Sequence, residues 1–151
     1  MYWSQEGSSS IDTKIERADM DGMNRIVVKS WNYYSHNIRS PNGLALDKEQ
    51  NRLYYFGDHT RRIYYVSLST GRESTLLDRT GYPKGTVVHG SYIYWTETQG
   101  RIGAVYRADK KSGRNVERVV SGLIGPEDIC VYDANDTLLQ EGMFHIGLCT
   151  V

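Results

Sequence analysis

Short runs of β-branched and aromatic residues alternate along this chain with turns rich in Gly, Asp and Asn. The apolar residues do not recur at the i, i+3, i+4 and i+7 spacing of an amphipathic helix, whereas runs of about four to six residues between turn residues are typical of strands. The pattern therefore predicts an all-β fold. It argues against a solenoid of helical repeats, the other architecture with repeats of comparable length.

One strand-like segment returns along the chain, each time after a proline. Pro41, Pro83 and Pro126 stand 42 and 43 residues apart, and an apolar segment follows each of them. A period of about 40 to 45 residues with several short strands is typical of a propeller blade with four antiparallel strands. Within each unit we expect the segment after proline, then an aromatic-pair segment, then an Ile/Val segment, then a closing segment.

An aromatic pair followed by a small polar residue and an acid or amide marks the second segment of each unit. It occurs as Tyr2, Trp3, Ser4, Gln5, then as Tyr55, Phe56, Gly57, Asp58, and then as Tyr94, Trp95, Thr96, Glu97. Aromatic residues in such strands most often pack in the core. Gly22, Gly71 and Gly113 stand where the third segment must reverse into the fourth, and glycine supplies the positive φ of such hairpin turns.

Composition and charge remove several function classes. The 151 residues carry 18 basic and 18 acidic side chains, and no basic cluster is interleaved with aromatics, so we expect no nucleic-acid partner. No apolar run approaches the roughly 20 residues of a membrane-spanning helix, so we expect no membrane insertion. The first residues lack the basic start and apolar stretch of a secretory signal. Two cysteines are too few for a disulfide framework.

With these registers aligned, residues 2 to 133 resemble the YWTD repeats (class B repeats) of the LDL-receptor family. The matching signature residues are Tyr2, Trp3, Tyr55, Phe56, Asp58, Tyr94, Trp95 and Thr96. The resemblance implies that residues 1–133 form part of a six-bladed YWTD β-propeller, with about three four-stranded blades. Residues 134–151 do not show the cysteine-rich module that follows in the family, and we expect this C-terminal tail to be poorly ordered.

The segment Gly125 to Tyr132 resembles the strand that closes the ring in this family. If it is that strand, the chain is an open arc whose first blade lacks its innermost strand and whose last strand lacks a blade to complete. Three blades are fewer than the four to eight with which propellers usually close. Exposed strand edges at both ends then predict self-association.

The resemblance implies a non-enzymatic module of an LDL-receptor-related receptor that binds secreted protein ligands outside the cell, in endocytosis or Wnt-type signalling. A nidogen-like matrix-binding module is the first alternative. A lactonase-like propeller hydrolase with a divalent cation in the channel is the second, although the sequence contains no nucleophile elbow, Walker loop, HExxH motif or zinc spacing. No cofactor is expected.

Ligand contact is expected from aromatics and acids of the loops, because exposed aromatics beside charges suit protein recognition. The candidates are Trp31, Tyr33, Tyr34, Asp58 and Glu97. Asn135 begins a glycosylation sequon, which would be used if the chain is exported.

Overall fold

The computed structural model describes residues 1–32, 38, 40–57, 60–132 and 145–147, which contain thirteen strands and no helix. Blade 1 consists of β1 (Tyr2–Gln5), β2 (Thr13–Arg17) and β3 (Ile26–Trp31). Blade 2 consists of β4 (Pro41–Asp47), β5 (Arg52–Gly57), β6 (Ile63–Ser67) and β7 (Glu73–Leu77). Blade 3 consists of β8 (Tyr82–His89), β9 (Tyr92–Gln99), β10 (Ile102–Asp109) and β11 (Glu117–Ile124). A separate pair joins β12 (Cys130–Tyr132) to β13 (His145–Gly147).

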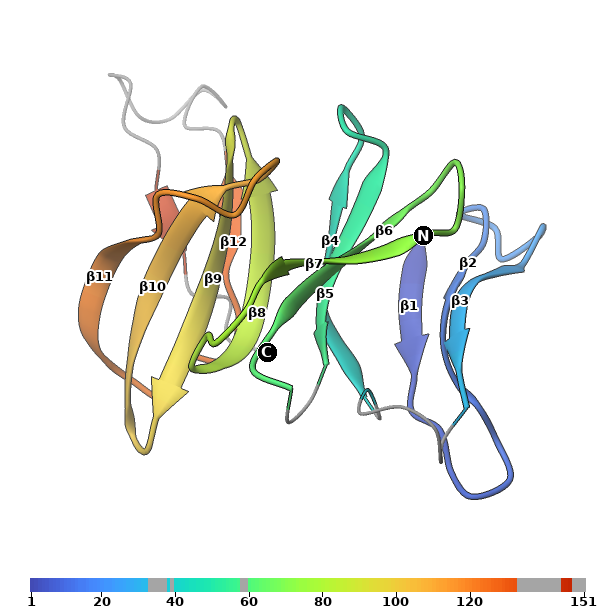
Figure 1. The fold of residues 1–151 in the computed structure, drawn as a ribbon, viewed down its shortest axis with the longest axis horizontal. Helices are drawn as coiled ribbons and strands as arrows, with labels where there is room; N and C mark the ends of the chain where they lie inside the picture. The colour runs from blue at the N-terminus through green and yellow to red at the C-terminus, as the bar shows by residue number, and fades with distance from the viewer. Residues whose placement is uncertain (33–37, 39, 58–59, 133–144, 148–151) are drawn as a thin grey trace.

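The three blades stand side by side in an arc, with blade 2 in the middle (Figure 1). Within each blade, consecutive strands pair in an antiparallel manner, in the order that the sequence predicts. The first strand of blade 2, β4, contacts the first strand of blade 3, β8, and β8 in turn contacts β12. The all-β propeller architecture is therefore confirmed. Among the described strands, blade 1 has three and lacks the first strand of a blade, as the sequence predicts.

A β-bulge in the Ile/Val strand aligns the three blades residue by residue. The register between this strand and the last strand shifts just after Ile15 in blade 1, Ile63 in blade 2 and Val105 in blade 3. All three side chains are fully buried, at 0%, 0% and 1% exposure. Bulges re-aim side chains and increase the local twist, so they give a fixed reference point in each sheet. The predicted turn glycines also have positive φ, 84° at Gly22, 67° at Gly71 and 69° at Gly113.

This alignment corrects the signature expected in blade 2. Trp95 pairs with Tyr106, the residue after the bulge position, and in blade 2 the residue that pairs with the equivalent Tyr64 is Tyr55. Trp95 stacks on Tyr106 at 5.8 Å, and Tyr55 stacks on Tyr64 at 5.7 Å. The blade 2 signature is thus Tyr54, Tyr55, Phe56, Gly57, and the phase that began at Tyr55 and ended at Asp58 is wrong by one residue.

The core lies between the blades rather than inside one of them. The cluster between blades 1 and 2 contains Ile15, Trp31, Ile38, Leu53, Tyr55, Tyr64 and Val66. The cluster between blades 2 and 3 contains Ala45, Tyr54, Ile63, Leu77, Ile93, Trp95 and Ala108. The first signature aromatic of a blade, such as Tyr54, therefore faces the following blade, and the second, such as Tyr55, faces the preceding one. Full burial of each large side chain contributes about 1.5–3 kcal/mol, so these two junctions hold the arc together.

The strand expected to lack a partner has one. β12 pairs antiparallel with β13, with Cys130 opposite Gly147 and Tyr132 opposite His145. β13 comes from the C-terminal tail, whose residues 134–144 and 148–151 lie outside the described residues, so the expected poor order of that tail stays a prediction. The closing strand thus has a partner from the tail, but among the described strands it belongs to a two-stranded sheet and completes no four-stranded blade.

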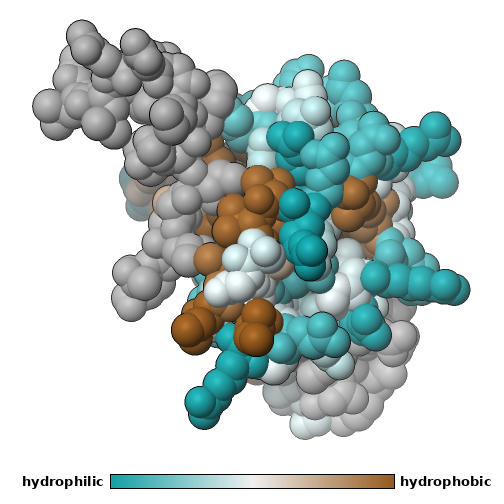
Figure 2. Space-filling model, turned by 90° about the vertical axis from the view of Figure 1, so that its left-hand side faces the viewer, coloured by the Kyte–Doolittle hydropathy of each residue, from teal (hydrophilic) through white to brown (hydrophobic). Residues whose placement is uncertain are grey.

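Apolar side chains remain exposed on the outer strand of blade 3. Val119, Val120 and Ile124 of β11 are 41%, 37% and 87% exposed, and Val116 just before the strand is 52% exposed. Figure 2 views the molecule from the side of blade 3, where brown hydrophobic surface lies among polar side chains. The outer strand of blade 3 thus presents a group of exposed aliphatic side chains.

Candidate ligand-binding face

Trp31 is a core residue and not the exposed ligand contact that the sequence predicts. Its side chain is 3% exposed and meets the ring of Tyr55 edge-on at 5.4 Å. Its Nε1 donates a hydrogen bond of 2.9 Å to Oε2 of Glu73, which also accepts a 2.6 Å hydrogen bond from the Tyr55 hydroxyl. The prediction is wrong because β3 extends through residue 31, which places the indole in the junction between blades 1 and 2.

Burial keeps the Tyr55 hydroxyl in its neutral, donating form. Burial, and then the hydrogen bond to Glu73, raise the pKa of Tyr55 well above its ordinary value. Glu73 therefore joins a phenol of blade 2 to an indole of blade 1, and both hydrogen bonds are charge-assisted. This arrangement is structural, because the indole and the phenol are buried in the junction between the two blades.

Glu97 is the other predicted ligand contact that the structure describes. It lies half-buried near the end of β9, and its Oε1 accepts a 2.7 Å hydrogen bond from Nε1 of Trp95. One carboxylate oxygen is thus used to orient the signature tryptophan. Tyr33, Tyr34 and Asp58, together with the sequon residue Asn135, lie outside the described residues, so their roles stay predictions.

Two adjoining clefts open at the end of blades 2 and 3 where Glu97 lies. The larger cleft, about 770 Å³, lies between the starts of β4 and β8 and the segment 127–129. The smaller cleft, about 290 Å³, follows the near ends of β9, β10 and β11. Arg61, Tyr82 and Thr98 line both clefts. We call this surface, with Lys84 and Thr86 of the larger cleft, the Arg61–Tyr82 face.

Arg61 is held in place by the neighbouring connector of blade 2. Its Nε donates a 2.9 Å hydrogen bond to the carbonyl of Thr80, whose own N–H donates to the carbonyl of Arg61 at 2.9 Å. The backbone of Arg61 has a φ of 53°, in the left-handed region that non-glycine residues seldom adopt. Such backbone strain is concentrated at functional sites. The guanidinium is therefore fixed before any ligand arrives.

Tyr82 contributes an exposed ring to both clefts. Its side chain is 55% exposed, and Cζ of Arg61 lies 5.7 Å from the centroid of its ring, within the range of a cation–π contact. A rigid exposed aromatic beside a fixed cation is the kind of anchor that dominates protein-binding surfaces.

The larger cleft also contains a buried hydroxyl without a partner among the described residues. Thr86 is 6% exposed, and its Oγ1 makes no hydrogen bond in this part of the chain. A Cβ atom at Gly43 would come within 2.9 Å of that oxygen, so the backbone of Gly43 packs directly beside it. Buried polar groups are nearly always hydrogen-bonded, which makes this oxygen a candidate for a ligand group or an ordered water.

Charges of both signs border the larger cleft. Lys84, 43% exposed in its side chain, lies 3.7 Å from a carboxylate oxygen of Glu127, which is 74% exposed. Asp128 lies beside Gly85, where an added Cβ atom would come within 2.4 Å of its Oδ1. With Arg61 this mixture suits a peptide, which offers donors, acceptors and both charges, better than a simple anion.

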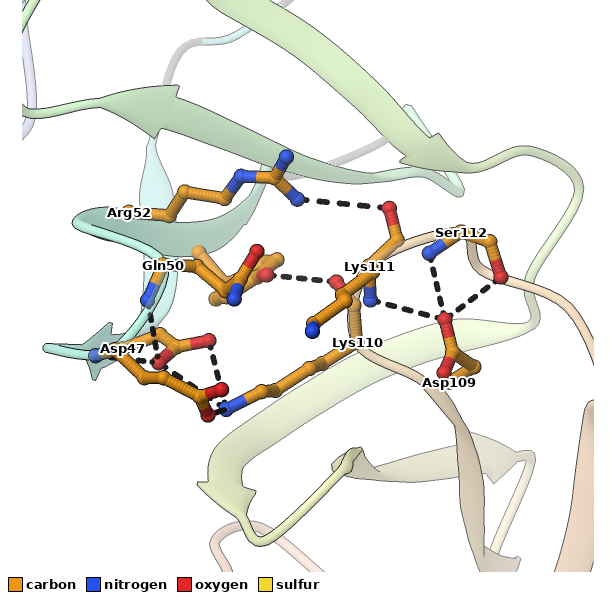
Figure 3. A network of polar contacts seen from close by, with 9 residues as sticks. Asp47, Gln50, Arg52, Asp109, Lys110, Lys111 and Ser112 are labelled. Atoms are coloured by element: carbon orange, nitrogen blue, oxygen red, sulfur yellow. Dashed lines mark hydrogen bonds and ion pairs between the residues drawn. The ribbon is translucent and has the colours of Figure 1, made fainter.

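The opposite end of the blades is closed by a polar network around Lys110 (Figure 3). Nζ of Lys110 lies 3.2 and 3.1 Å from the two carboxylate oxygens of Asp47 and 2.8 Å from Oε2 of Glu49. Lys110 and Asp47 are each 3% exposed. The hydroxyl of Tyr54 donates a 2.7 Å hydrogen bond to the carbonyl of Lys110. Because the groups belong to blades 2 and 3 and are paired with one another, this network joins the blades and offers no site.

The network shifts the ionisation of its members. The hydrogen bond from Lys110 lowers the pKa of Glu49. Burial alone would lower the pKa of Lys110, but its bonds to Glu49 and Asp47 outweigh that effect and raise it. Both shifts favour the charged forms, so the pair is ionised at neutral pH.

Two further findings concern only the described part of the chain. It contains no group of three or more His, Cys, Asp or Glu side chains that could hold a metal ion. None of its segments forms a helix long and apolar enough to cross a membrane.

Comparison with known proteins supplies relatives in sequence. No protein-family model matches the chain. It is 39% identical over 90 residues to low-density lipoprotein receptor-related protein 4 of Mus musculus, a match that covers 60% of this chain. It is 32% identical over 122 residues to low-density lipoprotein receptor-related protein 5 of Mus musculus, which covers 81% of this chain. The chain spans only 5% and 7% of these two relatives.

Solved structures share its fold. A chain of the nidogen/laminin complex superposes with a TM-score of 0.60 at 23% identity, covering 81% of this chain and 42% of that one. A luciferin-regenerating enzyme gives 0.59 at 17% identity, covering 78% and 39%. Likeness at this level of identity shows the propeller fold and no activity. The blade topology, the phased signatures and the two receptor relatives agree, and the chain belongs to the LDL-receptor class B (YWTD) repeat β-propellers.

Proposed function

We propose that this chain is a non-enzymatic, protein-ligand-binding module of an LDL-receptor-related receptor, and that its ligand binds the Arg61–Tyr82 face. The observation that carries the proposal is the 55% exposed ring of Tyr82, set on Arg61 between two clefts. The names of its sequence relatives, both receptor-related proteins, support a receptor role. We place this role outside the cell, in endocytosis or Wnt-type signalling. Residues 1–133 then form the propeller part and residues 134–151 a tail, with Asn135 open to glycosylation after export.

The geometry indicates how a peptide would bind. An apolar side chain of the ligand packs against the ring of Tyr82, while an acidic group pairs with Arg61 or Lys84, which border the larger cleft. A polar group that enters this cleft would bond to the hydroxyl of Thr86, which has no hydrogen-bond partner among the described residues. A buried hydrogen bond of this kind contributes about 0.5–1.5 kcal/mol, and its loss would leave the hydroxyl unsatisfied again.

The binding test uses a displayed library of random twelve-residue peptides, panned against the immobilised 151-residue chain. Selected peptides are counter-screened on Tyr82→Ala and Arg61→Ala. Because these side chains are proposed as anchors, each substitution should weaken binding at least about tenfold. Tyr65→Ala is the matched control, since Tyr65 is a half-buried tyrosine of blade 2 that lines neither cleft.

Peptides that bind Tyr82→Ala and Arg61→Ala as tightly as the unaltered chain would contradict this ligand face. Immobilised laminin is the probe for the nidogen-like alternative, which binding independent of both residues would favour. Calorimetric titration with Ca²⁺ is the probe for the lactonase-like hydrolase, which tight stoichiometric uptake would favour.

A further inference from the structure

A groove crosses the outer part of the junction between blades 2 and 3. The smaller cleft described above and a third cleft of about 280 Å³ share Gly81, Glu97 and Tyr106 in their linings. The third cleft is otherwise bordered by residues 77–80 of blade 2 and by Val116, just before β11. We call the joint surface of these two clefts the outer groove.

The outer groove has an apolar floor between two raised sides. Across the sheet of blade 3, Trp95 pairs with Tyr106, and Tyr106 pairs with Arg118, so the three residues form one row. Tyr106 is half-buried and stacks on Trp95 at 5.8 Å. The connector 78–81 packs against Glu97 of β9 on one side of Tyr106, and Arg118 of β11 lies on the other side. An extended peptide could therefore lie along Tyr106 between the connector and β11.

The acidic side chains of the outer groove already have partners. Oε1 of Glu97 accepts the 2.7 Å hydrogen bond from Nε1 of Trp95. Its Oε2 packs against the connector, since a Cβ atom at Gly81 would come within 2.3 Å of it. Asp78 accepts a 2.8 Å hydrogen bond from Nε of Arg62. Neither carboxylate is therefore left to bind a cationic ligand.

Two arginines of the outer groove have no such partner. Arg79 and Arg118 are both exposed, and neither forms an ion pair with any other residue that the structure describes. The charge that the groove offers to a ligand is thus positive, and its complement is an acidic group.

The connector also carries a buried hydroxyl. Thr80 borders the third cleft, is 8% exposed, and its Oγ1 has no hydrogen-bond partner in the described part of the chain. The connector does not need this hydroxyl to close. The bond from the N–H of Thr80 to the carbonyl of Arg61 is repeated in blade 3 from Gly125 to Arg101. Because buried polar groups are nearly always hydrogen-bonded, this oxygen is suited to bond a polar group of a ligand.

We propose that the outer groove binds an extended segment of a protein ligand that carries an apolar and an acidic side chain two residues apart. Side chains two apart in an extended chain share a face and lie roughly 7 Å apart, as those of Val116 and Arg118 do along the outer strand. The apolar side chain packs on Val116 and Tyr106, the acidic one pairs with Arg118, and a backbone group bonds to the hydroxyl of Thr80. This subsite extends the Arg61–Tyr82 face outward over blade 3, and it rests on the proposed function in taking a protein as the ligand.

NMR titration of the ¹⁵N-labelled 151-residue chain with capped tripeptides tests the proposal. The probes are acetyl-Leu-Gly-Glu-amide and the reversed acetyl-Glu-Gly-Leu-amide, and each has a neutral counterpart in which glutamine replaces glutamate. At least one acidic probe should bind about threefold more tightly than its counterpart, because an exposed ion pair contributes an effect of this size. The amide signals of residues 79–81 and 116–118 should shift on binding.

Substitutions assign the two polar contacts. Arg118→Gln should abolish the preference for the acidic probe. Arg101→Gln is the matched control and should keep it, because Arg101 is an exposed arginine of blade 3 that lines none of the three clefts. Thr80→Val removes the hydroxyl with little change of shape and should weaken acidic and neutral probes alike, by about threefold. Circular dichroism shows whether each variant is folded.

The outer groove and the Arg61–Tyr82 face can fail separately. If only the face fails, the twelve-residue peptides bind Arg61→Ala as tightly as the unaltered chain, while the tripeptide preference still depends on Arg118. If only the groove fails, the twelve-residue peptides depend on Arg61 and Tyr82, while acidic and neutral tripeptides bind alike.

Three results would overturn the proposal. The first is the absence of any saturable shift, or of any preference for glutamate, with both orders of the probe. The second is a preference that survives in folded Arg118→Gln, or that is lost only in Arg61→Ala. The third is a folded Thr80→Val protein that binds the probes as tightly as the unaltered chain.

Discussion

At the scale of single residues, Lys110 shows how an unusual side chain is accommodated in a repeat. It lies five residues after the bulge position, where blade 1 carries Met20 and blade 2 carries Leu68. Leu68 packs against the cluster between blades 1 and 2. A buried ammonium costs several kcal/mol in desolvation unless it is well paired, and Asp47 provides that pairing at 3.1 Å.

Lys110→Met should lower the free energy of unfolding by about 3 kcal/mol, because it leaves the carboxylate of Asp47 buried without its cation. The double variant Lys110→Met with Asp47→Asn should recover most of this loss, since a neutral amide oxygen can still accept the N–H bonds of Glu49 and Gln50. Urea denaturation followed by fluorescence measures all three proteins. A double variant as unstable as Lys110→Met would contradict the role given to Asp47.

Arg62→Met is the control for this series. Arg62 and Asp78 form an ion pair whose side chains are 45% and 56% exposed. Exposed pairs contribute little, so the urea midpoint should stay close to that of the unaltered chain.

The same network predicts a pH dependence with a defined sign. Glu49 has a folded pKa below its ordinary 4.5, so its contribution is present above pH 4.5 and is lost as the pH falls through the lowered value. Lys110 has a folded pKa above its ordinary 10.5, so its contribution is present below that pH and is lost as the pH rises through the raised value. The stability difference between the unaltered chain and Glu49→Gln should be constant from about pH 6 to 9 and shrink below about pH 4. A difference that grows on acidification would contradict the assignment.

Trp31→Phe tests the structural role of the indole. The substitution removes the hydrogen bond from Nε1 to Glu73 and should cost about 1–2 kcal/mol of stability, because bonds to charged groups are stronger than neutral ones. Binding of the selected peptides should not change, since Trp31 is 3% exposed. Weaker peptide binding by a folded Trp31→Phe protein would restore the ligand-contact interpretation.

At the scale of strands, the third signature position is filled in two different ways. In blade 3, the N–H of Gly85 donates a 2.9 Å hydrogen bond to Oγ1 of Thr96. In blade 2 the equivalent pair is Gly43 and Phe56, and a Cβ atom on Gly43 would come within 2.1 Å of the ring. The first strand of blade 2 can approach β5 so closely only because residue 43 has no side chain.

Gly43→Ala should therefore destabilise the chain more than Gly71→Ala. Both positions have positive φ, 58° and 67°, which costs an alanine about 1–2 kcal/mol, but a Cβ at Gly71 meets nothing within 4 Å. The clash with Phe56 should add about 1–3 kcal/mol at Gly43. In a Phe56→Thr background this extra cost should largely disappear, and a double-mutant cycle by thermal denaturation measures the coupling. Equal costs for Gly43→Ala in both backgrounds would contradict the contact.

Much of the strand order could be predicted from the sequence, because proline spacing and turn glycines are local signals. The phase of the blade 2 signature could not, since three consecutive aromatics, Tyr54 to Phe56, contain two possible pairs. Only the cross-strand partner Tyr64 decides between them. The sequence placed Trp31 in an exposed loop for a related reason. Nothing local shows that β3 extends to residue 31, because this depends on the packing of the indole between blades 1 and 2.

The Arg61–Tyr82 face could not be predicted, because it joins a connector residue of blade 2 to the first residue of β8 in blade 3. Arg61 follows β5 and Tyr82 begins β8, and their contact depends on the bond from Arg61 to Thr80. The only local sign of this face was that Arg61 lies in a polar segment between two strands, and many other residues of the chain do so too.

At the scale of the whole molecule, the two ends of the blades have different tasks. One end carries the Lys110 network, where buried charges join blades 2 and 3. The other end carries the two clefts, Arg61 with its left-handed backbone, and a hydroxyl on Thr86 that lacks a partner within the described part of the chain. The end with the Lys110 network is held by paired charges, whereas the end with the Arg61–Tyr82 face keeps polar groups that a ligand could bond. The second end is therefore the one suited to bind a ligand.

Hydrogen exchange of the chain with and without a selected peptide tests this division most directly. Bound peptide should slow exchange in residues 60–62, 80–86 and 98–102, which form or flank the Arg61–Tyr82 face, and should leave the hairpins at 48–51 and 110–114 unchanged. Protection confined to those hairpins, around the Lys110 network, would contradict the proposed ligand face.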